Sequence, residues 1–287
     1  MKQLLVISGK GGTGKTTMVS SFAFLAKNKT IADCDVDASD LHLILEPEVR
    51  KKENFTSQVA VKDDSICTEC GLCYEKCRFD AIDENYNIDP LRCEGCGVCA
   101  YVCPADAIEM ENEISGEYFL SDTKCGSMVH ARLEPGGENS GQLVTAVKRE
   151  AGEVASKEGK DLILIDGSPG TGCPVIASLA NVDLALIVAE PTLSGVHDLK
   201  RILGVAEQFG VTSLICINKF DLNLENTEDI EDFARSKGIE VVGKIPYSNE
   251  VTEAMVQGKS VVENPDGEVK KAIENTWERI ENRLEED

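Results

Sequence analysis

The chain has 287 residues, 42% of them hydrophobic, which is enough for one large α/β domain with a smaller unit beside it. Its formal net charge is −22, from 29 Lys and Arg against 51 Asp and Glu. This balance argues against a sequence-independent nucleic-acid binder, which needs clustered cations, and against docking on anionic lipid. No run of 18 apolar residues occurs, so the sequence predicts no membrane span. We expect no nucleic-acid and no membrane partner.

The first residues have the apolar character of a strand, not of a signal peptide. Twelve cysteines in such a chain indicate thiolate metal ligands in a reducing compartment, not disulfides. We therefore expect a cytoplasmic protein. Two of these cysteines, Cys34 and Cys216, lie in or beside apolar strand patterns and are interpreted as small core residues.

Short apolar runs rich in β-branched residues predict buried parallel strands, with helical patterns between them. Strands are predicted at 2–8, before the acidic run 33–37, and at 161–165, 183–189, 213–218 and 240–245. Helices are predicted at 15–27, 140–157, 174–180, 194–209, 226–237 and 268–284. The last helix has an apolar stripe that we interpret as a docking face onto the core, formed by Val269, Ile273, Trp277, Ile280 and Leu284. This alternation predicts an α/β fold with a mostly parallel sheet and helices on both faces.

A glycine-rich loop, Gly9-Lys10-Gly11-Gly12-Thr13-Gly14-Lys15-Thr16-Thr17, lies between the first strand and the first helix. Bare backbone N–H groups in such a loop can point at phosphates, and the helix N-terminus adds partial positive charge. Lys15 is expected to reach the β- and γ-phosphates, Thr16 to offer its hydroxyl to Mg²⁺, and Thr17 to bond near the α-phosphate. The nucleotide-binding residues expected here are Gly11, Gly12, Thr13, Gly14, Lys15, Thr16 and Thr17.

Residues 59–116 break the α/β pattern with an internal repeat at an offset of 26 residues. Each copy has the spacing C-x₂-C-x₂-C-x₃-C, in which three cysteines bind one cluster and the fourth binds the other. One [4Fe–4S] cluster is therefore assigned to Cys67, Cys70, Cys73 and Cys103, and a second to Cys93, Cys96, Cys99 and Cys77. Structural zinc is the alternative, because C-x₂-C pairs also form zinc sites. We interpret 59–116 as a small α+β ferredoxin-like domain inserted into an ATPase domain made of 1–58 and 117–287.

The glycine-rich loop has an additional, early lysine, Lys10, and in this it resembles the loop of the MinD/ParA/Mrp ATPases and the nitrogenase iron protein. The chain is most similar to members of that family with an inserted two-cluster ferredoxin domain. The resemblance implies ATP as substrate and a homodimer, or a heterodimer with a related ATPase, in which Lys10 reaches the partner's ATP. It also implies that Asp35 positions the attacking water and that Asp166, at the start of Asp166-Gly-Ser-Pro-Gly170, holds a water bound to Mg²⁺. A solvated loop carboxylate is the alternative for either acid.

The identity of the base is less constrained by the sequence. Asn218-Lys219-Phe220-Asp221 follows a strand and matches the pattern in which GTPases use the aspartate to pair with guanine. In the family that the chain resembles, the asparagine contacts adenine and a proline such as Pro246 lies nearby. Lys10 favours the second interpretation, and thus ATP.

Two further cysteines could form an extra site. Cys173 follows Asp166 by seven residues, as a cluster-ligand cysteine does in the nitrogenase iron protein, whereas Cys125 lies upstream of that strand. The resemblance allows both residues, from two protomers, to bind a third metal or cluster at a dimer interface. The alternative is that both are buried bystanders.

The combined motifs predict a P-loop ATPase that hydrolyses ATP with Lys10, Lys15, Asp35 and Asp166 as its catalytic residues and contains two [4Fe–4S] clusters. We expect ATP turnover to drive assembly or transfer of Fe–S clusters to a client protein. The alternative is ATP-gated electron transfer to a redox partner, as in the nitrogenase iron protein. The net charge and the lack of a basic amphipathic tail count against a third function, spatial organisation like that of ParA and MinD.

Overall fold

In the computed structural model, which describes residues 1–134 and 140–286, nine strands form one sheet in the order β3-β4-β5-β2-β6-β1-β7-β8-β9. The strands are β1 (Lys2–Ser8), β2 (Lys29–Asp33), β3 (Glu48–Lys62), β4 (Ile108–Thr123), β5 (Gly126–Leu133), β6 (Leu162–Pro169), β7 (Leu184–Ala189), β8 (Thr212–Asn218) and β9 (Glu240–Ile245). The helices are α1 (Lys15–Leu25), α2 (His42–Leu45), α3 (Leu72–Lys76), α4 (Val98–Tyr101), α5 (Ser140–Lys157), α6 (Cys173–Leu179), α7 (Leu193–Gln208), α8 (Leu224–Lys237), α9 (Asn249–Val256) and α10 (Glu268–Glu286), with 3₁₀ turns η1 (Phe220–Leu222) and η2 (Val261–Glu263).

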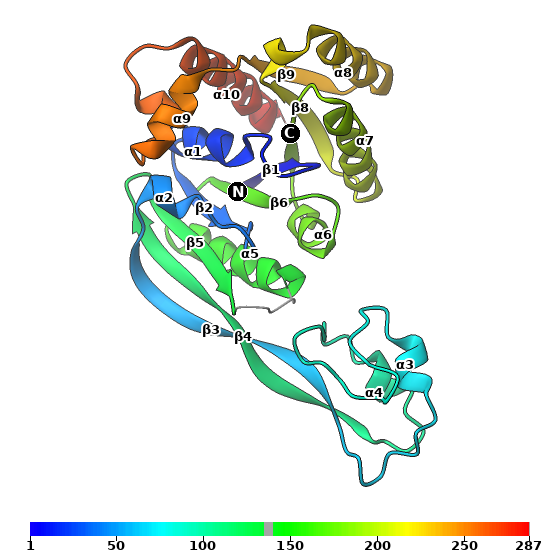
Figure 1. Ribbon diagram of the computed structural model, residues 1–287. Coiled ribbons are helices and arrows are strands. Elements are labelled where there is room, and N and C mark those ends of the chain that lie inside the picture. Colours follow the sequence, from blue (N-terminus) through cyan, green and yellow to red (C-terminus); the bar gives the residue numbers. More distant parts are fainter. Residues whose placement is uncertain (135–139, 287) are drawn as a thin grey trace.

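The sheet is buried on both faces, as the continuous apolar runs predict. Successive residues of β1 point to opposite faces: Leu4 packs in one core with α1 and α10, whereas Leu5 packs in the other with α5, α6, α7 and α8 (Figure 1). Strands β5, β2, β6, β1, β7, β8 and β9 run parallel, whereas β3–β4 and β4–β5 pair antiparallel. The predicted fold class is therefore confirmed.

The last helix docks on the core through the predicted stripe. Ile273 and Ile280 are fully buried, and the ring of Trp277 lies 5.1 Å from that of Phe22 on α1, measured between centroids. Cys34 and Cys216 are also fully buried in the two cores, as predicted. None of the helices in the two described stretches is both long enough and apolar enough to span a bilayer.

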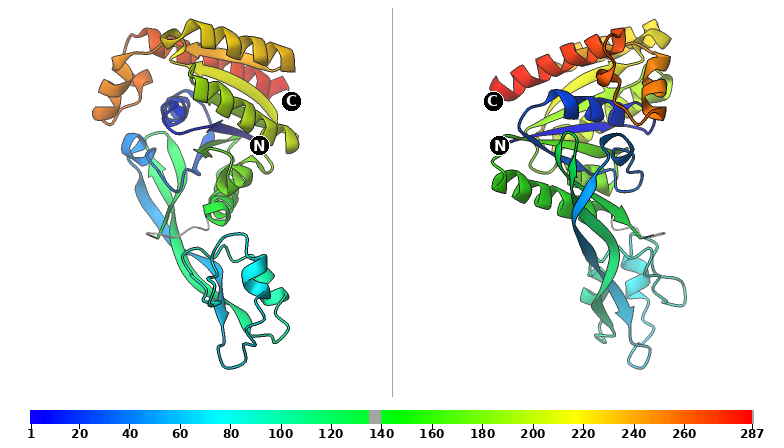
Figure 2. Two further views of the ribbon diagram at one scale, coloured as in Figure 1. Left: turned by 45° about the vertical axis from the view of Figure 1, so that its right-hand side comes forward. Right: turned by 90° about the vertical axis from the view of Figure 1, so that its left-hand side faces the viewer.

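Strands β3 and β4 form a long antiparallel arm that the sequence analysis did not predict. They pair from Glu48 opposite Asp122 to Lys62 opposite Ile108, and the arm extends from the α/β body to the small unit with α3 and α4 (Figures 1 and 2). The boundaries proposed at 58/59 and 116/117 fall inside these two strands. β3 lacks an apolar run because most of its first half is exposed to solvent, which removes the pattern typical of a buried strand.

Candidate functional site

The phosphate loop has its shape because glycine occupies position 14. Gly14 is the N-cap of α1 with φ of 91°, a left-handed conformation that favours glycine. A Cβ there would lie 2.2 Å from Nδ2 of Asn218. That amide donates a hydrogen bond of 2.7 Å to the backbone oxygen of Thr13, so the end of β8 is joined directly to the loop.

A cavity of about 410 Å³ opens beside this loop. Its lining includes all the nucleotide-binding residues predicted from the sequence, namely Gly11, Gly12, Thr13, Gly14, Lys15, Thr16, Thr17, Asn218 and Pro246, together with Asp35, which was predicted to be catalytic. The segment after β9 and helix α9 add apolar lining that includes Tyr247, Val251 and Met255, which suits the faces of a planar base. A polar loop next to apolar walls is the arrangement that a nucleoside phosphate requires.

Lys15 lies between two carboxylates. Its Nζ is 2.6 Å from Oδ1 of Asp166 and 3.0 Å from Oδ2 of Asp35, and its side chain is only 6% exposed. Burial by itself would lower the pKa of Lys15, but the charges of Asp166 and Asp35 outweigh it and raise that pKa. The lysine is therefore charged at any physiological pH and can stabilise the negative charge of a phosphate.

A third acid, Asp33, belongs to the same buried group, although the sequence analysis did not select it. It lies opposite Asp166 in the parallel register of β2 and β6, and it accepts hydrogen bonds from the Ser39 hydroxyl at 2.6 Å and from the Asp35 N–H at 3.1 Å. Burial, together with the charge of Asp166, raises the pKa of Asp33. The signal in the sequence is the alternation of aspartates at 33, 35 and 37 immediately after a strand.

The residues beside Lys15 suit a magnesium ion. Oδ1 of Asp35 is buried and has no hydrogen-bond partner among residues 1–134 and 140–286. The Thr16 hydroxyl is near enough to Asp166 to favour its charged carboxylate form, so the two side chains predicted for this ion are adjacent. Burial raises the pKa of Asp166, opposed by the nearby charge of Lys15. Hard oxygen donors next to a phosphate site are what Mg²⁺ requires.

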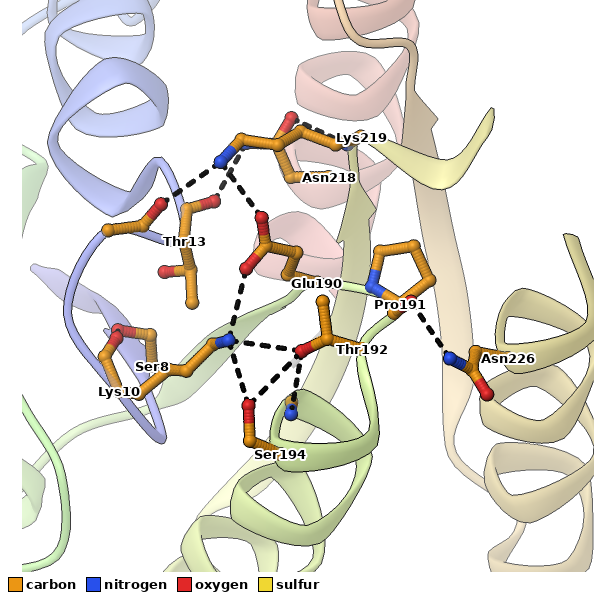
Figure 3. Close-up of polar contacts among 12 residues, drawn as sticks. Ser8, Lys10, Thr13, Glu190, Pro191, Thr192, Ser194, Asn218, Lys219 and Asn226 are labelled. Carbon is orange, nitrogen blue, oxygen red and sulfur yellow. Dashed lines mark hydrogen bonds and ion pairs between the residues drawn. The ribbon is translucent and has the colours of Figure 1, made fainter. Parts of the chain in front are cut away.

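Lys10 does not line this cavity. Its Nζ contacts its own chain, at 3.0 Å from Thr192 Oγ1, 3.1 Å from Ser194 Oγ and 3.1 Å from Glu190 Oε2 (Figure 3). The other oxygen of Glu190 lies 2.9 Å from Nζ of Lys219. Burial would raise the pKa of Glu190, but hydrogen bonds from Lys219 and Lys10 outweigh it and lower that pKa. The sequence analysis missed Glu190, because no motif contains it.

The arrangement of Asp221 bears on the choice of base. Its Oδ1 accepts a hydrogen bond of 2.7 Å from the backbone N–H of Tyr247, and Asp221 is not among the described residues that line the cavity. An aspartate that pairs with guanine must face the base. The geometry thus favours adenine, with Asn218 and Pro246 in the lining.

The two sets of cysteines predicted from the repeat line two separate small cavities in the unit at the end of the arm. One is lined by Cys67, Cys70, Cys73 and Cys103, and the other by Cys77, Cys93, Cys96 and Cys99. Backbone N–H groups donate to two of the sulfurs, from Ala107 to Cys103 at 3.2 Å and from Ala60 of β3 to Cys93 at 3.4 Å.

Four cysteines line each of these two cavities. Across the described ranges, no three side chains of His, Cys, Asp or Glu meet at a point that could hold one metal ion. In a [4Fe–4S] cube each of the four thiolates binds a different iron, so the sulfurs surround a space and do not converge. Burial raises the pKa of the Cys99 thiol to about 11, so bound iron would be needed to keep it as a thiolate.

Cys125 and Cys173 lie far apart within one chain. Cys125 precedes β5 at the amino end of the parallel strands, where the neighbouring Gly126 lies against the backbone of Lys29, and it is partly buried against the core. Cys173 is exposed at the start of α6, beyond the carboxyl end of β6. The structure does not bring these two thiols together.

Some known proteins resemble this chain over nearly its whole length, and others over about half of it. The model of the CobQ/CobB/MinD/ParA nucleotide binding domain matches residues 4–261. An uncharacterized protein of Methanocaldococcus jannaschii is 34% identical over 97% of this chain and 96% of its own length. An iron-sulfur cluster carrier protein of Pyrococcus furiosus is 27% identical over 51% of this chain and 54% of its own.

Among solved structures, the septum site-determining protein MinD of Pyrococcus horikoshii, complexed with Mg-ADP, has the same fold. Its TM-score is 0.61 at 17% identity, covering 98% of this chain and 96% of that one. Together with the match over residues 4–261, these findings give one conclusion: the chain belongs to the CobQ/CobB/MinD/ParA family of nucleotide-binding domains and is a P-loop ATPase.

Proposed function

We propose that this ATPase forms an ATP-dependent dimer, carries two [4Fe–4S] clusters, and uses nucleotide binding and hydrolysis to control those clusters. The observation that carries the proposal is the grouping of the eight cysteines. The two cavities divide them into the two sets that ferredoxin spacing requires, with the fourth cysteine of each repeat in the other repeat's set.

In the hydrolysis step, Lys15 binds the β- and γ-phosphates and gives up part of its contact with Asp35 and Asp166 to do so. The released Asp35 carboxylate then orients the water that attacks the γ-phosphorus. Thr16, and Asp166 through a water molecule, would hold Mg²⁺, which would add positive charge beside the phosphates. The partner subunit supplies its own copy of the early lysine, so complete charge stabilisation requires a closed dimer.

Besides the β3–β4 arm, helix α5 of the ATPase core contacts the cysteine unit. Gln142, in its first turn, donates a hydrogen bond of 3.1 Å to the backbone oxygen of Glu94, which lies between two cysteines of the second set. Gly141 packs against Cys173 at the start of α6. Further along α5, Lys148 donates to the backbone oxygens of Ser178 and Ala180 at the other end of α6.

Because α6 directly follows the segment that begins at Asp166, a shift of that segment moves α6 and, through these contacts, α5. Movement of α5 then changes its contact with the loop that holds the second cysteine set. Occupancy of the nucleotide site and the state of the clusters therefore become two inputs to one conformational equilibrium.

Of the two candidate functions, electron delivery and cluster transfer, the geometry of the cysteines favours ATP-gated electron delivery. Each cavity has a complete set of four cysteines, which suits resident clusters better than a cargo in transit. The two remaining candidate thiols, Cys125 and Cys173, are not paired within a chain, so a labile carrier site would need a second protomer. Cluster transfer to a client is the second candidate, supported by the exposed Cys173 and by the similarity to the Pyrococcus furiosus carrier protein.

Iron and zinc quantitation in anaerobically purified protein tests the clusters directly. About eight irons per chain are expected, with loss of about four in Cys70→Ser and in Cys96→Ser, since each variant removes a ligand of one cube only. Stoichiometric zinc in place of iron would contradict the cluster assignment.

A second experiment distinguishes electron delivery from cluster transfer. The dithionite-reduced protein is mixed by stopped flow with an oxidised low-potential flavodoxin, with and without ATP. Electron delivery predicts cluster oxidation that ATP accelerates while iron stays bound. Cluster transfer predicts loss of iron to an apo-ferredoxin acceptor, dependent on Cys173. Equal oxidation rates with and without ATP, and no iron loss, would contradict both.

A further inference from the structure

Glu190 occupies the junction of three loops at the carboxyl end of the sheet. It directly follows β7, and its carboxylate bridges Lys10 of the phosphate loop to Lys219, which follows β8 (Figure 3). Its side chain is 14% exposed, whereas those of Lys10 and Lys219 are 28% and 27% exposed. Neither the hydrolysis step nor the base pocket uses this carboxylate.

The position that Lys10 occupies is unfavourable for a cation without Glu190. The ammonium group lies against Thr192, the N-cap of α7, and Ser194 in the first turn of that helix. The N-terminus of a helix carries partial positive charge and repels cations. No acidic side chain lies in the first turn of α7. Glu190 is the carboxylate that offsets this repulsion.

We propose that Glu190 is a positioning residue that holds Lys10 on its own chain and must release it before Lys10 can reach the nucleotide of the partner subunit. This inference rests on the proposed function, in which Lys10 acts across a dimer. Glu190 thereby sets how readily two ATP-bound chains close.

Lys219 makes the release possible at low cost. When Lys10 leaves, Glu190 keeps its ion pair with Lys219, so no buried carboxylate is left without a partner. Lys219 also donates to the backbone oxygen of Gly12 at 3.2 Å, which keeps the phosphate loop attached while its neighbour moves. The Glu190–Lys219 ion pair therefore stays in place, and the Lys10 side chain moves.

The test is the protein concentration at which ATPase activity per chain reaches half its maximum, measured for Glu190→Gln. Each dimer must release two copies of Lys10, and each release breaks a partly exposed ion pair of modest strength. We therefore expect the half-maximal concentration to fall about tenfold, with the plateau rate changed by less than about twofold. An unchanged or higher half-maximal concentration would overturn the inference.

Two comparisons guard against a merely structural effect. Glu207→Gln removes the same charge from the exposed face of α7, far from Lys10, and should leave the half-maximal concentration unchanged. Ser194→Ala removes one hydrogen-bond acceptor of Lys10 and should lower that concentration by about twofold. If Glu190→Gln does not fold, Ser194→Ala tests the inference in its place. A half-maximal concentration that does not fall in Ser194→Ala would then overturn the inference.

Lys10→Ala distinguishes this inference from the proposed function. If Lys10→Ala hydrolyses ATP at the wild-type rate with unchanged concentration dependence, the role of Lys10 across the dimer is wrong, and the proposed function fails at that point. If Lys10→Ala is impaired but Glu190→Gln behaves as wild type, only the role of Glu190 fails.

Discussion

At the scale of single residues, the candidate site is a balance of charges around one lysine. Lys15 pairs with both Asp35 and Asp166, and Asp33 lies behind them with a raised pKa. If either Asp35 or Asp166 is replaced, Lys15 still has one carboxylate partner. A substitution at one of these acids can therefore impair catalysis while the site keeps its structure.

For Asp35→Asn we therefore expect ATP binding within about threefold of wild type and a fall in kcat of at least about 100-fold, the size typical for loss of a group that orients the nucleophile. Isothermal titration with ATP and a phosphate-release assay measure the two quantities. Asp37→Asn, which removes a nearby acid that does not contact Lys15, is the matched control. A variant that hydrolyses normally would rule out Asp35 as the residue that orients water.

The hydrogen bond of Asp221 to the Tyr247 backbone gives a prediction about base selection. If Asp221 supports the loop and does not read the base, Asp221→Asn should change the ratio of kcat/KM for ATP over GTP by less than about threefold, because the neutral side chain can still accept that bond. Side-by-side turnover of both nucleotides measures the ratio. A large gain for either base would show that this aspartate faces the nucleotide.

At the scale of elements, the base of the β3–β4 arm joins the sheet through β5, and His130 of β5 packs there. Its ring stacks on Phe119 of β4 at 5.0 Å between centroids, and its Nε2 is 3.0 Å from the Ser121 hydroxyl. Burial, with a smaller effect from the charge of His42, lowers the pKa of His130 to about 4. The neutral ring is therefore part of the folded packing.

This pKa predicts a loss of stability in acid. An unfolded histidine titrates near pH 6.5, so between about pH 6.5 and 4 the unfolded chain binds the proton that the folded one does not, and unfolding becomes easier as pH falls. His130→Gln should remove about 2 kcal/mol of the stability difference between pH 7 and pH 4.5, after allowance for partial exposure. Urea unfolding of both proteins at matched iron content measures it. Parallel pH profiles would contradict a buried neutral histidine.

At the scale of the whole molecule, the β3–β4 arm places the cysteine unit away from the sheet, but helix α5 still contacts that unit (Figures 1 and 2). The contact includes a hydrogen bond from the Gln142 side chain to a backbone oxygen, and this bond can be removed without changing a cysteine or a nucleotide ligand.

For Gln142→Ala we expect full iron content and an unchanged basal ATPase rate, but a loss of at least about half of any ATP-induced shift in the EPR spectrum or potential of the clusters. Lys157→Ala, at the other end of α5, serves as control because its side chain contacts only Glu153 of the same helix in the polar contacts of the described chain. If both variants retain the full shift, coupling does not pass through the first turn of α5.

Much of the candidate site was predictable because its residues are close together in sequence. The phosphate loop with Lys15 and the two cysteine repeats are local patterns, and Asp35 directly follows a predicted strand, so sequence spacing identifies these reactive groups. The buried strands and the apolar stripe of α10 were predictable for a similar reason, because periodicity reports burial.

What the sequence by itself determined was therefore the set of candidate groups: a phosphate loop, acids that follow strands, and two sets of thiols. Only the tertiary structure decided how these are joined. The long β3–β4 arm, the partners Asp33 and Glu190, and the separation of Cys125 from Cys173 all depend on which strands become neighbours. Such neighbours are set by packing between segments that lie 46 (Lys62 and Ile108) to 180 (Lys10 and Glu190) residues apart in the sequence, and no local spacing records that packing.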